Sequence, residues 1–498
     1  MGINLKMSDI GKSEYCCNVV RIGEVKPIEG SDFLGHTFVN GNSMVVRKDQ
    51  VKEGMLMFYA PNESQLNHDF LSANNLYEIG CYDKNQNCSE VEALINANKK
   101  DDAKRMCGFF NKHGRVRMIR LRGVPSMGYL FTLDELIKYN SNAVHIDMEQ
   151  MLNVDFDTID DVLFIKAYVP PMPVERAPRT KSEKRQKKLK KFDRIIPGTF
   201  AFHYDTNPLA KNMHRINPED NVSISVKMHG TSAIYANVQT KVPIKLPFLA
   251  RLWNKFVDCT GLFKSFRAPD YSIDWGDVYS SRTVIKNKDI NPDTNGGYYK
   301  VDVWGEYNEL LKNYIPRGMT IYGEIVGYLT GSQSMIQKGF DYGCEVGTNK
   351  FMPYRIVTED ADGVKHEWDV KDVITYTQML RKMLRPDDQD KIIDLPLLYN
   401  GTLRDLYKDV DPDNHWHENV LMKLKMDKMH FGMEELEPLC NLKAPREGIC
   451  LRIDGDIEAE CFKLKTDLFA EKEAKAVDAG AVDIEMAQAY GSDEDVDA

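Results

Sequence analysis

Residues 222–230 read Val222-Ser223-Ile224-Ser225-Val226-Lys227-Met228-His229-Gly230, and they indicate the fold more strongly than any other stretch. Apolar and polar side chains alternate up to Lys227, which predicts a β-strand with one buried face. Lys227 then ends the polar face, close to a glycine where backbone can approach a ligand. This arrangement would present an amine nucleophile. A lysine in a surface turn would give the same short pattern, so the rest of the chain must decide.

Further short motifs follow in a fixed order. They are Ser281-Arg282, Gly323-Glu324, Tyr354-Arg355-Ile356, Glu447-Gly448 and Lys463-Leu464-Lys465. Lys463 and Lys465 stand two apart in a strand-like stretch, so both point to one side, while Phe462 and Leu464 face a core. Ammonium groups neutralise phosphate charge and a carboxylate holds a divalent ion. The set therefore suits a triphosphate with its metal.

As an ordered set, these motifs resemble the covalent nucleotidyltransferases, the superfamily of polynucleotide ligases and mRNA-capping guanylyltransferases. The resemblance covers about residues 220–468. A histidine at the motif position of His229 resembles the form seen in the RNA ligase 2 branch. Val226 departs from that branch, where glutamate is frequent before the lysine. The resemblance implies an ATP-dependent RNA ligase that joins 3′-hydroxyl and 5′-phosphate ends of nicked or bridged duplexes. It would act through lysyl-AMP and RNA-adenylate, with RNA repair as its purpose.

The N-terminal part resembles the OB-type domain of the RNA ligase 5 family, at residues 24–30, 45–48, 54 and 120–128. Short β-rich segments with Gly and Pro between them agree with a small barrel. About thirty residues follow Lys465, so we expect no C-terminal OB domain of the kind in DNA ligases and capping enzymes. These two enzymes are the alternatives to an RNA ligase. A third alternative is a non-catalytic nucleic-acid-binding protein.

We therefore expect an α+β protein with an N-terminal OB-type β-barrel domain. A nucleotidyltransferase core, an ATP-grasp-like ligase fold of antiparallel sheets and helices with a helical insertion, would follow it. The expected parts are a flexible arm (1–14), the OB-type domain with its own helical insertion (15–150), a linker with a basic segment (151–195), the core (196–470) with an insertion at about 359–438, and an acidic, largely disordered tail (471–498).

The resemblance implies a role for each site residue. Lys227 would attack the α-phosphorus of ATP, and Lys463 and Lys465 would contact the α-phosphate as further catalytic residues. Glu447 would hold Mg²⁺ or Mn²⁺, and Glu324 would bind the ribose. The expected ATP-binding set is Lys227, His229, Gly230, Arg282, Glu324, Tyr354, Glu447, Lys463 and Lys465.

Ordinary structural roles compete with these assignments. Tyr354 would stack on adenine, with Phe351 as its rival, and either ring would equally suit a core. Exposed glutamates are common on strands, and a K-x-K pattern is common on a solvated face. His229 would support the nucleotide pocket or be a buried histidine bonded to backbone.

The charge pattern is uneven although the 498 residues carry a net charge of −10. Residues 175–194 hold ten Lys and Arg against three acids, whereas residues 471–498 hold nine acids against two lysines. The basic run would follow a phosphate backbone, act as a nuclear localisation patch, or be a solvated charge run. Arg115, Arg117, Arg120 and Arg122 add to the expectation of an RNA or nicked-duplex partner.

Ten cysteines without a C-x-x-C pair, and no apolar segment of signal-peptide or membrane-spanning type, favour a reducing intracellular compartment. We expect a cytoplasmic protein, with a nuclear location as the alternative that the basic run would explain. No membrane partner is expected. The oligomeric state is open, and a monomer is favoured.

Overall fold

The structure is a computed structural model. It describes residues 3–8, 13–169, 194–203, 206–243, 271–286, 301–412, 414–455 and 459–478, and the separate residues 247, 249, 250, 252, 253, 256, 257 and 299. Most of the predicted basic run (175–193) and residues 479–498 of the predicted tail lie outside the described residues. Helices and antiparallel sheets share the chain, which confirms the α+β class. Within the described residues, no helix is both long enough and apolar enough to cross a bilayer.

The N-terminal region holds short strands around an aromatic core that includes Phe58, Phe70, Phe131 and Phe164. A capping box between Thr132 and Glu135 begins one of its helices. Its helices are α1 (His68–Ala73), α2 (Cys88–Asn96), α3 (Lys100–Arg105) and α4 (Leu133–Tyr139). Its strands are β1 (Leu5–Lys6), β2 (Cys17–Arg21), β3 (Lys26–Pro27), β4 (Leu34–Val39), β5 (Asn42–Arg47), β6 (Leu56–Ala60), β7 (Ser64–Leu66), β8 (Ile119–Leu121), β9 (Val124–Ser126), β10 (Tyr129–Phe131), β11 (Asp155–Phe156), β12 (Thr158–Ile159), β13 (Val162–Leu163) and β14 (Ile165–Ala167).

The expected barrel is not confirmed. In the described part of the N-terminal region, these strands form separate sheets, the largest in the order β10-β6-β2-β11, and they do not close on one another. The predicted boundaries also differ from the structure. Strand β1 lies in the expected arm but pairs with β12, and strands β11 to β14 lie in the expected linker but pair within the N-terminal region. Pairing with long-range partners orders both segments, a feature that composition does not reveal.

The C-terminal region contains two five-stranded sheets. The first has the order β15-β24-β23-β16-β22 and the second the order β18-β17-β19-β20-β21. Apart from the parallel pair β15 and β24, all their strand pairs are antiparallel. The first sheet consists of β15 (Asn207–Pro208), β16 (Asn221–Lys227), β22 (Leu397–Thr402), β23 (Gly448–Ile453) and β24 (Glu460–Lys465). The second consists of β17 (Thr231–Pro243), β18 (Tyr271–Ser280), β19 (Met319–Gly327), β20 (Asn349–Glu359) and β21 (Lys365–Glu367).

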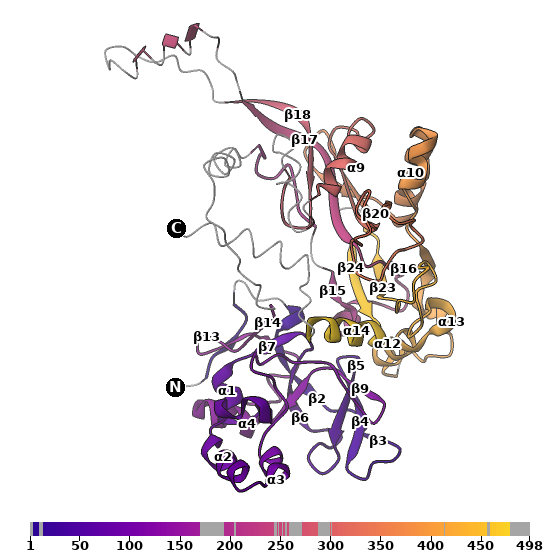
Figure 1. The fold of residues 1–498 in the computed structure, drawn as a ribbon. Helices are drawn as coiled ribbons and strands as arrows, with labels where there is room; N and C mark the ends of the chain where they lie inside the picture. The colour runs from indigo at the N-terminus through magenta and orange to yellow at the C-terminus, as the bar shows by residue number, and fades with distance from the viewer. Residues whose placement is uncertain are drawn as a thin grey trace.

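Helices cover these sheets, and β17 with β18 extends beyond the body of the molecule as a two-stranded ribbon (Figure 1). The helices are α6 (Leu209–Asn212), α9 (Val303–Leu311), α10 (Val370–Met383), α11 (Leu403–Leu406), α12 (Trp416–Met426), α13 (Lys428–Phe431) and α14 (Asp467–Asp478). The expected insertion at 359–438 does contain helices, but it also supplies β22 to the first sheet. It is therefore partly an element of that sheet.

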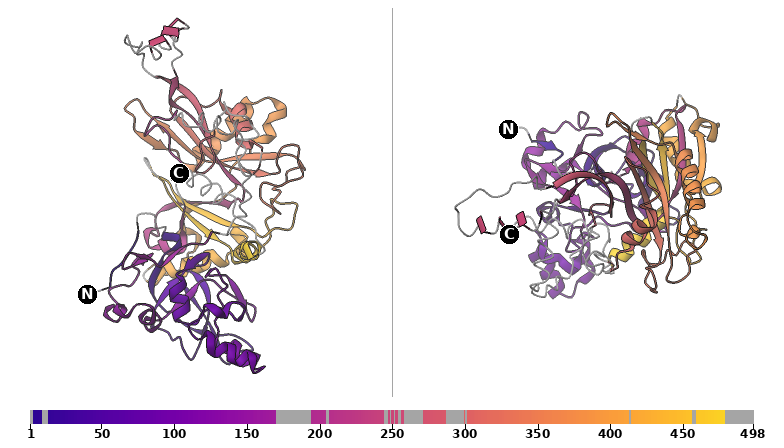
Figure 2. Two further views of the ribbon diagram at one scale, coloured as in Figure 1. Left: turned by 60° about the vertical axis from the view of Figure 1, so that its left-hand side comes forward. Right: turned by 90° about the horizontal axis from the view of Figure 1, so that it is seen from above.

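Helix α14 joins the two regions. It lies between the N-terminal strands and the C-terminal sheets (Figures 1 and 2), and Ala470 and Ala474 pack against Met118 and Met127. Residues 471–478, the start of the predicted acidic tail, are part of this docked helix. Small side chains on one helix face allow this close packing, whereas the high acid content of the segment suggested disorder.

Candidate active site

The predicted strand around Lys227 is present, and its two faces differ as the alternation predicts. In β16, β23 and β24, Lys227 lies opposite Gly448, which lies opposite Lys465. Ser225, Cys450 and Lys463 form the next row in the same way. The other face is apolar and buried, and its members are Val222, Ile224, Ile449, Leu451, Phe462 and Leu464. The register therefore places three lysines on one polar face.

Gly448 is required at the centre of this face. Its φ of +154° accompanies very close packing against β24, and a Cβ there would lie 2.0 Å from the carbonyl oxygen of Leu464. No side chain fits that space. The absence of a side chain also leaves room between Lys227 and Lys465, which lie on either side of this glycine.

A cavity of about 140 Å³ lies beside Lys227, between the two sheets. Strands β16 and β23 supply one wall, and β19 and β20 supply the other. Of the predicted residues, Lys227, Arg282, Glu324 and Tyr354 line it. Its complete lining is His203, Thr206, Ser223, Ser225, Val226, Lys227, Met228, Ser232, Arg282, Glu324, Met352, Tyr354, Arg355, Val370, Leu395, Cys450, Arg452 and Cys461.

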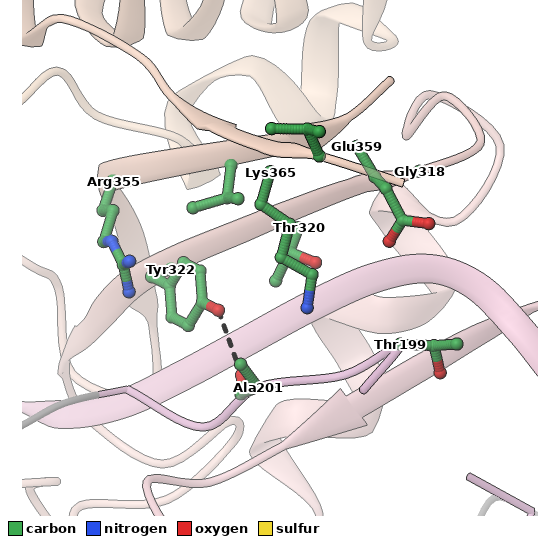
Figure 3. Close-up of a pocket in the computed structure, with 10 residues that line it drawn as sticks. Thr199, Ala201, Gly318, Thr320, Tyr322, Arg355, Glu359 and Lys365 are labelled. Carbon is green, nitrogen blue, oxygen red and sulfur yellow. Dashed lines mark hydrogen bonds between the residues drawn. The ribbon is translucent and has the colours of Figure 1, made fainter. Parts of the chain in front are cut away.

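A second cavity of about 380 Å³ lies at the other end of β19 and β20. Figure 3 shows Tyr322 and Arg355 at its edge, where the Tyr322 hydroxyl donates a hydrogen bond to the carbonyl of Ala201. Its one lining lysine, Lys365, donates to the carbonyl of Gly198 at 2.6 Å. Lys227, Arg282, Glu324 and Tyr354 line the smaller cavity and not the larger one, so we take the smaller cavity as the candidate site.

Lys227 forms an ion pair with Glu447. The amine lies 2.6 Å from Glu447 Oε1, and the glutamate is buried. Burial alone would lower the pKa of Lys227, but Glu447 and Cys450 together outweigh burial and hold that pKa above its usual value. Burial alone would raise the pKa of Glu447, but Lys227 and then His229 outweigh it and hold that pKa well below the usual range. In this state the amine is a protonated cation.

His229 supports the same carboxylate. Its Nδ1 lies 3.5 Å from Glu447 Oε2, and its ring packs edge-on against Phe340 and Phe469. Its backbone N–H donates to the Tyr342 hydroxyl at 2.6 Å. His229 does not line the cavity. Its position agrees with a supporting role behind Glu447.

Glu324 reaches the loop that follows Lys227. Its Oε1 accepts a hydrogen bond from the backbone N–H of Gly230 at 3.1 Å. A Cβ at Gly230 would lie 2.3 Å from the carbonyl oxygen of Ile325, so only glycine allows this approach. The predicted K-x-H-G and G-E motifs thus meet across β16 and β19, although Gly230 itself does not line the cavity.

Lys463 and Lys465 lie on the expected face but outside the cavity lining, and each is paired with a carboxylate. Lys463 lies 2.8 Å from Glu14 of the N-terminal region, and Lys465 lies 3.0 Å from Glu473 of α14. Burial lowers the pKa of Lys463 despite Glu14. For Lys465 the effect of burial is outweighed by Glu473 and Glu447, and its pKa is well above the usual value.

The two aromatic rivals are separated by the structure. Tyr354 lines the cavity, and its ring lies 5.3 Å from that of His203. Phe351 is fully buried in a different core, against Tyr235 and Tyr307. Phe351 is therefore a core residue, which leaves Tyr354 as the ring available to a base.

Sequence reasoning missed several residues of this site. Arg452 lines the cavity and is held by Asp454 at 2.6 Å and by Glu367 at 3.4 Å. Its place two residues after Cys450 on one strand was a usable signal, because alternation puts both on the same face. Glu14 gave no such signal, because it lies about 450 residues from Lys463 in the sequence.

A divalent cation fits Glu447. Among the described residues, no donor makes a hydrogen bond of ordinary geometry to its buried Oε2. No group of three or more His, Cys, Asp or Glu in the described chain is arranged to hold a metal. Mg²⁺ commonly takes one or two protein carboxylates and completes its shell with substrate phosphates and water. The donor set therefore suits a metal that enters with a triphosphate.

No protein-family model matches the sequence, and no curated protein matches it either. Among solved structures, Naegleria gruberi RNA ligase is similar over 92% of this chain. An apo mutant of that enzyme has 16% identity, a TM-score of 0.48 and 98% of its own chain covered. A mutant with ATP and Mn has 16% identity and a TM-score of 0.47, again with 98% covered. The enzyme with PPi has 15% identity and a TM-score of 0.45. At these values the likeness is distant.

Proposed function

We propose that this protein is an ATP-dependent RNA ligase that works through a covalent lysyl-AMP. One observation carries the proposal: Lys227 stands at a cavity edge beside a buried glutamate, on the same sheet face as Lys463 and Lys465. An amine, a metal-binding carboxylate and two phosphate-binding cations are what nucleotidyl transfer to lysine requires. The ordered motifs of the sequence support the same chemistry.

In the first step, the Lys227 amine attacks the α-phosphorus of ATP. A P–N bond forms, the bond to pyrophosphate breaks, and the nitrogen of the attacking neutral amine releases one proton to water. Lys463 and Lys465 would neutralise charge on the α-phosphate as the pentavalent state forms. Tyr354 would stack on adenine, Glu324 would bind the ribose, and Arg282 would contact the nucleotide or the RNA end.

Lys227 must lose its proton before it attacks. The pair with Glu447 opposes this loss, because the carboxylate favours the ammonium form. Mg²⁺ or Mn²⁺ held by Glu447 would neutralise charge on the carboxylate and on the phosphates. Glu447 would then no longer stabilise the lysine proton, and the buried position of the amine would favour its neutral form.

The later steps act on RNA. AMP would pass from Lys227 to a 5′-phosphate, and a 3′-hydroxyl would then attack that phosphate and release AMP. The N-terminal region would bind a nicked or bridged duplex. Its arginines contribute less than the sequence suggests. Arg115, Arg117 and Arg120 pair with carboxylates of this chain, and Arg120 and Arg122 are the two exposed members of the group.

Covalent labelling tests the proposal. The protein is incubated with α-labelled ATP or α-labelled GTP and Mg²⁺ or Mn²⁺, and then denatured. Label from ATP alone is expected, with loss of label after chelation of the metal and in Lys227→Ala. Label from GTP alone would assign the protein to the capping class. Label that survives in Lys227→Ala would refute the nucleophile.

Sealing assays test the substrate. We expect sealing of nicks whose 3′-hydroxyl strand is RNA in preference to all-DNA nicks. A preference for all-DNA nicks would make the protein a DNA ligase. Folded protein that binds nicked duplex but accepts no label would be a non-catalytic binder.

A further inference from the structure

The N-terminal region reaches the lysine face of the first sheet. The short 3₁₀ turn Ser13–Tyr15 places Glu14 Oε2 2.8 Å from the Lys463 amine. Both side chains are largely shielded, with 26% of Glu14 and 13% of Lys463 exposed. This pair differs from a surface ion pair, because shielding strengthens the interaction and fixes its geometry.

Apart from Glu14, the surroundings of Lys463 favour its neutral form. Burial, Lys465 on its own strand and Lys227 on β16 each favour loss of its proton. Cys450 of β23 lies next to it in the same row. Among these neighbours, Glu14 is the group that favours the charged form. An ammonium carries three donors, so a bond to Glu14 leaves two for a phosphate.

We propose that Glu14 is a positioning residue of the nucleotide site, which keeps Lys463 cationic and oriented for the α-phosphate. The inference rests on the proposed function, and it makes the N-terminal region a participant in lysine adenylylation. Lys463 acts on the phosphate, and Glu14 acts only through Lys463.

The test compares two variants that each remove one carboxylate from the contact between the two regions. Glu14→Gln keeps the size and a hydrogen-bond acceptor but removes the charge. Glu471→Gln is the control, because Glu471 pairs with Arg120 at 2.6 Å across the same contact and with Lys475 of its own helix, rather than with Lys463. Adenylylation is measured with α-labelled ATP as kcat/KM, from about pH 7 to about pH 9.

In Glu14→Gln, we expect kcat/KM to fall less than about threefold at neutral pH and about tenfold at about pH 9, because Lys463 loses its proton earlier. Glu471→Gln should follow the wild-type profile. A Glu14→Gln profile parallel to that of the control would overturn the inference. A lower KM for ATP in Glu14→Gln at every pH would also overturn the inference, because Glu14 would then compete with the phosphate for Lys463. Wild-type protein that takes no label would refute the proposed function instead.

Discussion

The pair of Lys227 and Glu447 is the centre of the site at the scale of single residues. Removing the two charges from water costs free energy. The attraction between Lys227 and Glu447 offsets that cost only while both side chains stay charged. The carboxylate has a lowered pKa, so its contribution is present above the usual pKa of a glutamate and is lost as pH falls. The lysine has a raised pKa, so its contribution is present below the usual pKa of a lysine and is lost as pH rises.

We therefore predict that the double variant Lys227→Met/Glu447→Gln has a flatter dependence of stability on pH than the wild type. Between pH 7 and pH 3, the wild type should lose about 2 kcal/mol more of its free energy of unfolding. Urea titrations at the two pH values measure the difference. Equal losses in the two proteins would contradict the ion pair.

Tyr354 and Phe351 differ in what each supports, and variants should separate the two. Tyr354→Ala should raise KM for ATP about tenfold, because base–aromatic stacking contributes about 1–3 kcal/mol. It should change stability little. Phe351→Ala should instead cost about 3–5 kcal/mol of stability, because it leaves a cavity in a closed core. Measurement of KM for ATP and of the unfolding midpoint for both variants checks which ring stacks on the base. A large loss of stability in Tyr354→Ala and a raised KM in Phe351→Ala would reverse the two roles.

At the scale of elements, strand alternation predicts most of the site. It places Lys227, Lys463 and Lys465 on one face and their apolar neighbours in the core. The pattern succeeds because one face of this sheet is buried in the core, whereas the other carries the lysines and borders the cavity. It could not give the order of strands, which brings together segments more than 200 residues apart.

Gly448 controls the spacing of β23 and β24. We predict that Gly448→Ala lowers the free energy of unfolding by at least about 2 kcal/mol, because the new Cβ meets the backbone of Leu464. Adenylylation should fall even where the variant stays folded, since the strands that carry the lysines must separate. Gly331→Ala is a matched control: its φ is also positive, but nothing lies within 4 Å of the added Cβ. Equal effects of the two substitutions would contradict a steric role.

At the scale of the whole molecule, acidic α14 is held by arginines of the N-terminal region. Arg115 is 1% exposed and binds Glu63 and Asp478, whereas Arg120 binds Glu471 at a more open position. Composition suggested that these arginines bind RNA and that the acidic segment is disordered. In the structure the arginines pair with the acidic residues of α14. Pairing between segments so far apart in the sequence leaves no local signal in either segment.

We predict that Arg115→Ala costs about 3 kcal/mol of stability, because it removes a fully buried cation and leaves the partly buried Glu63 without its partner. Arg120→Ala should cost less than about 1 kcal/mol, as exposed pairs contribute little. Denaturant titrations of the two variants give the comparison. Similar costs would show that α14 is not held in the described position.

The location of the covalent adenylate tests the central claim most directly. The protein is incubated with ATP and Mg²⁺, digested, and its peptides are mapped by mass spectrometry. We predict AMP on the peptide that contains Lys227, in an acid-labile phosphoramidate bond, and on no other lysine. AMP on Lys463 or Lys465, or a folded protein that carries no AMP, would contradict the account.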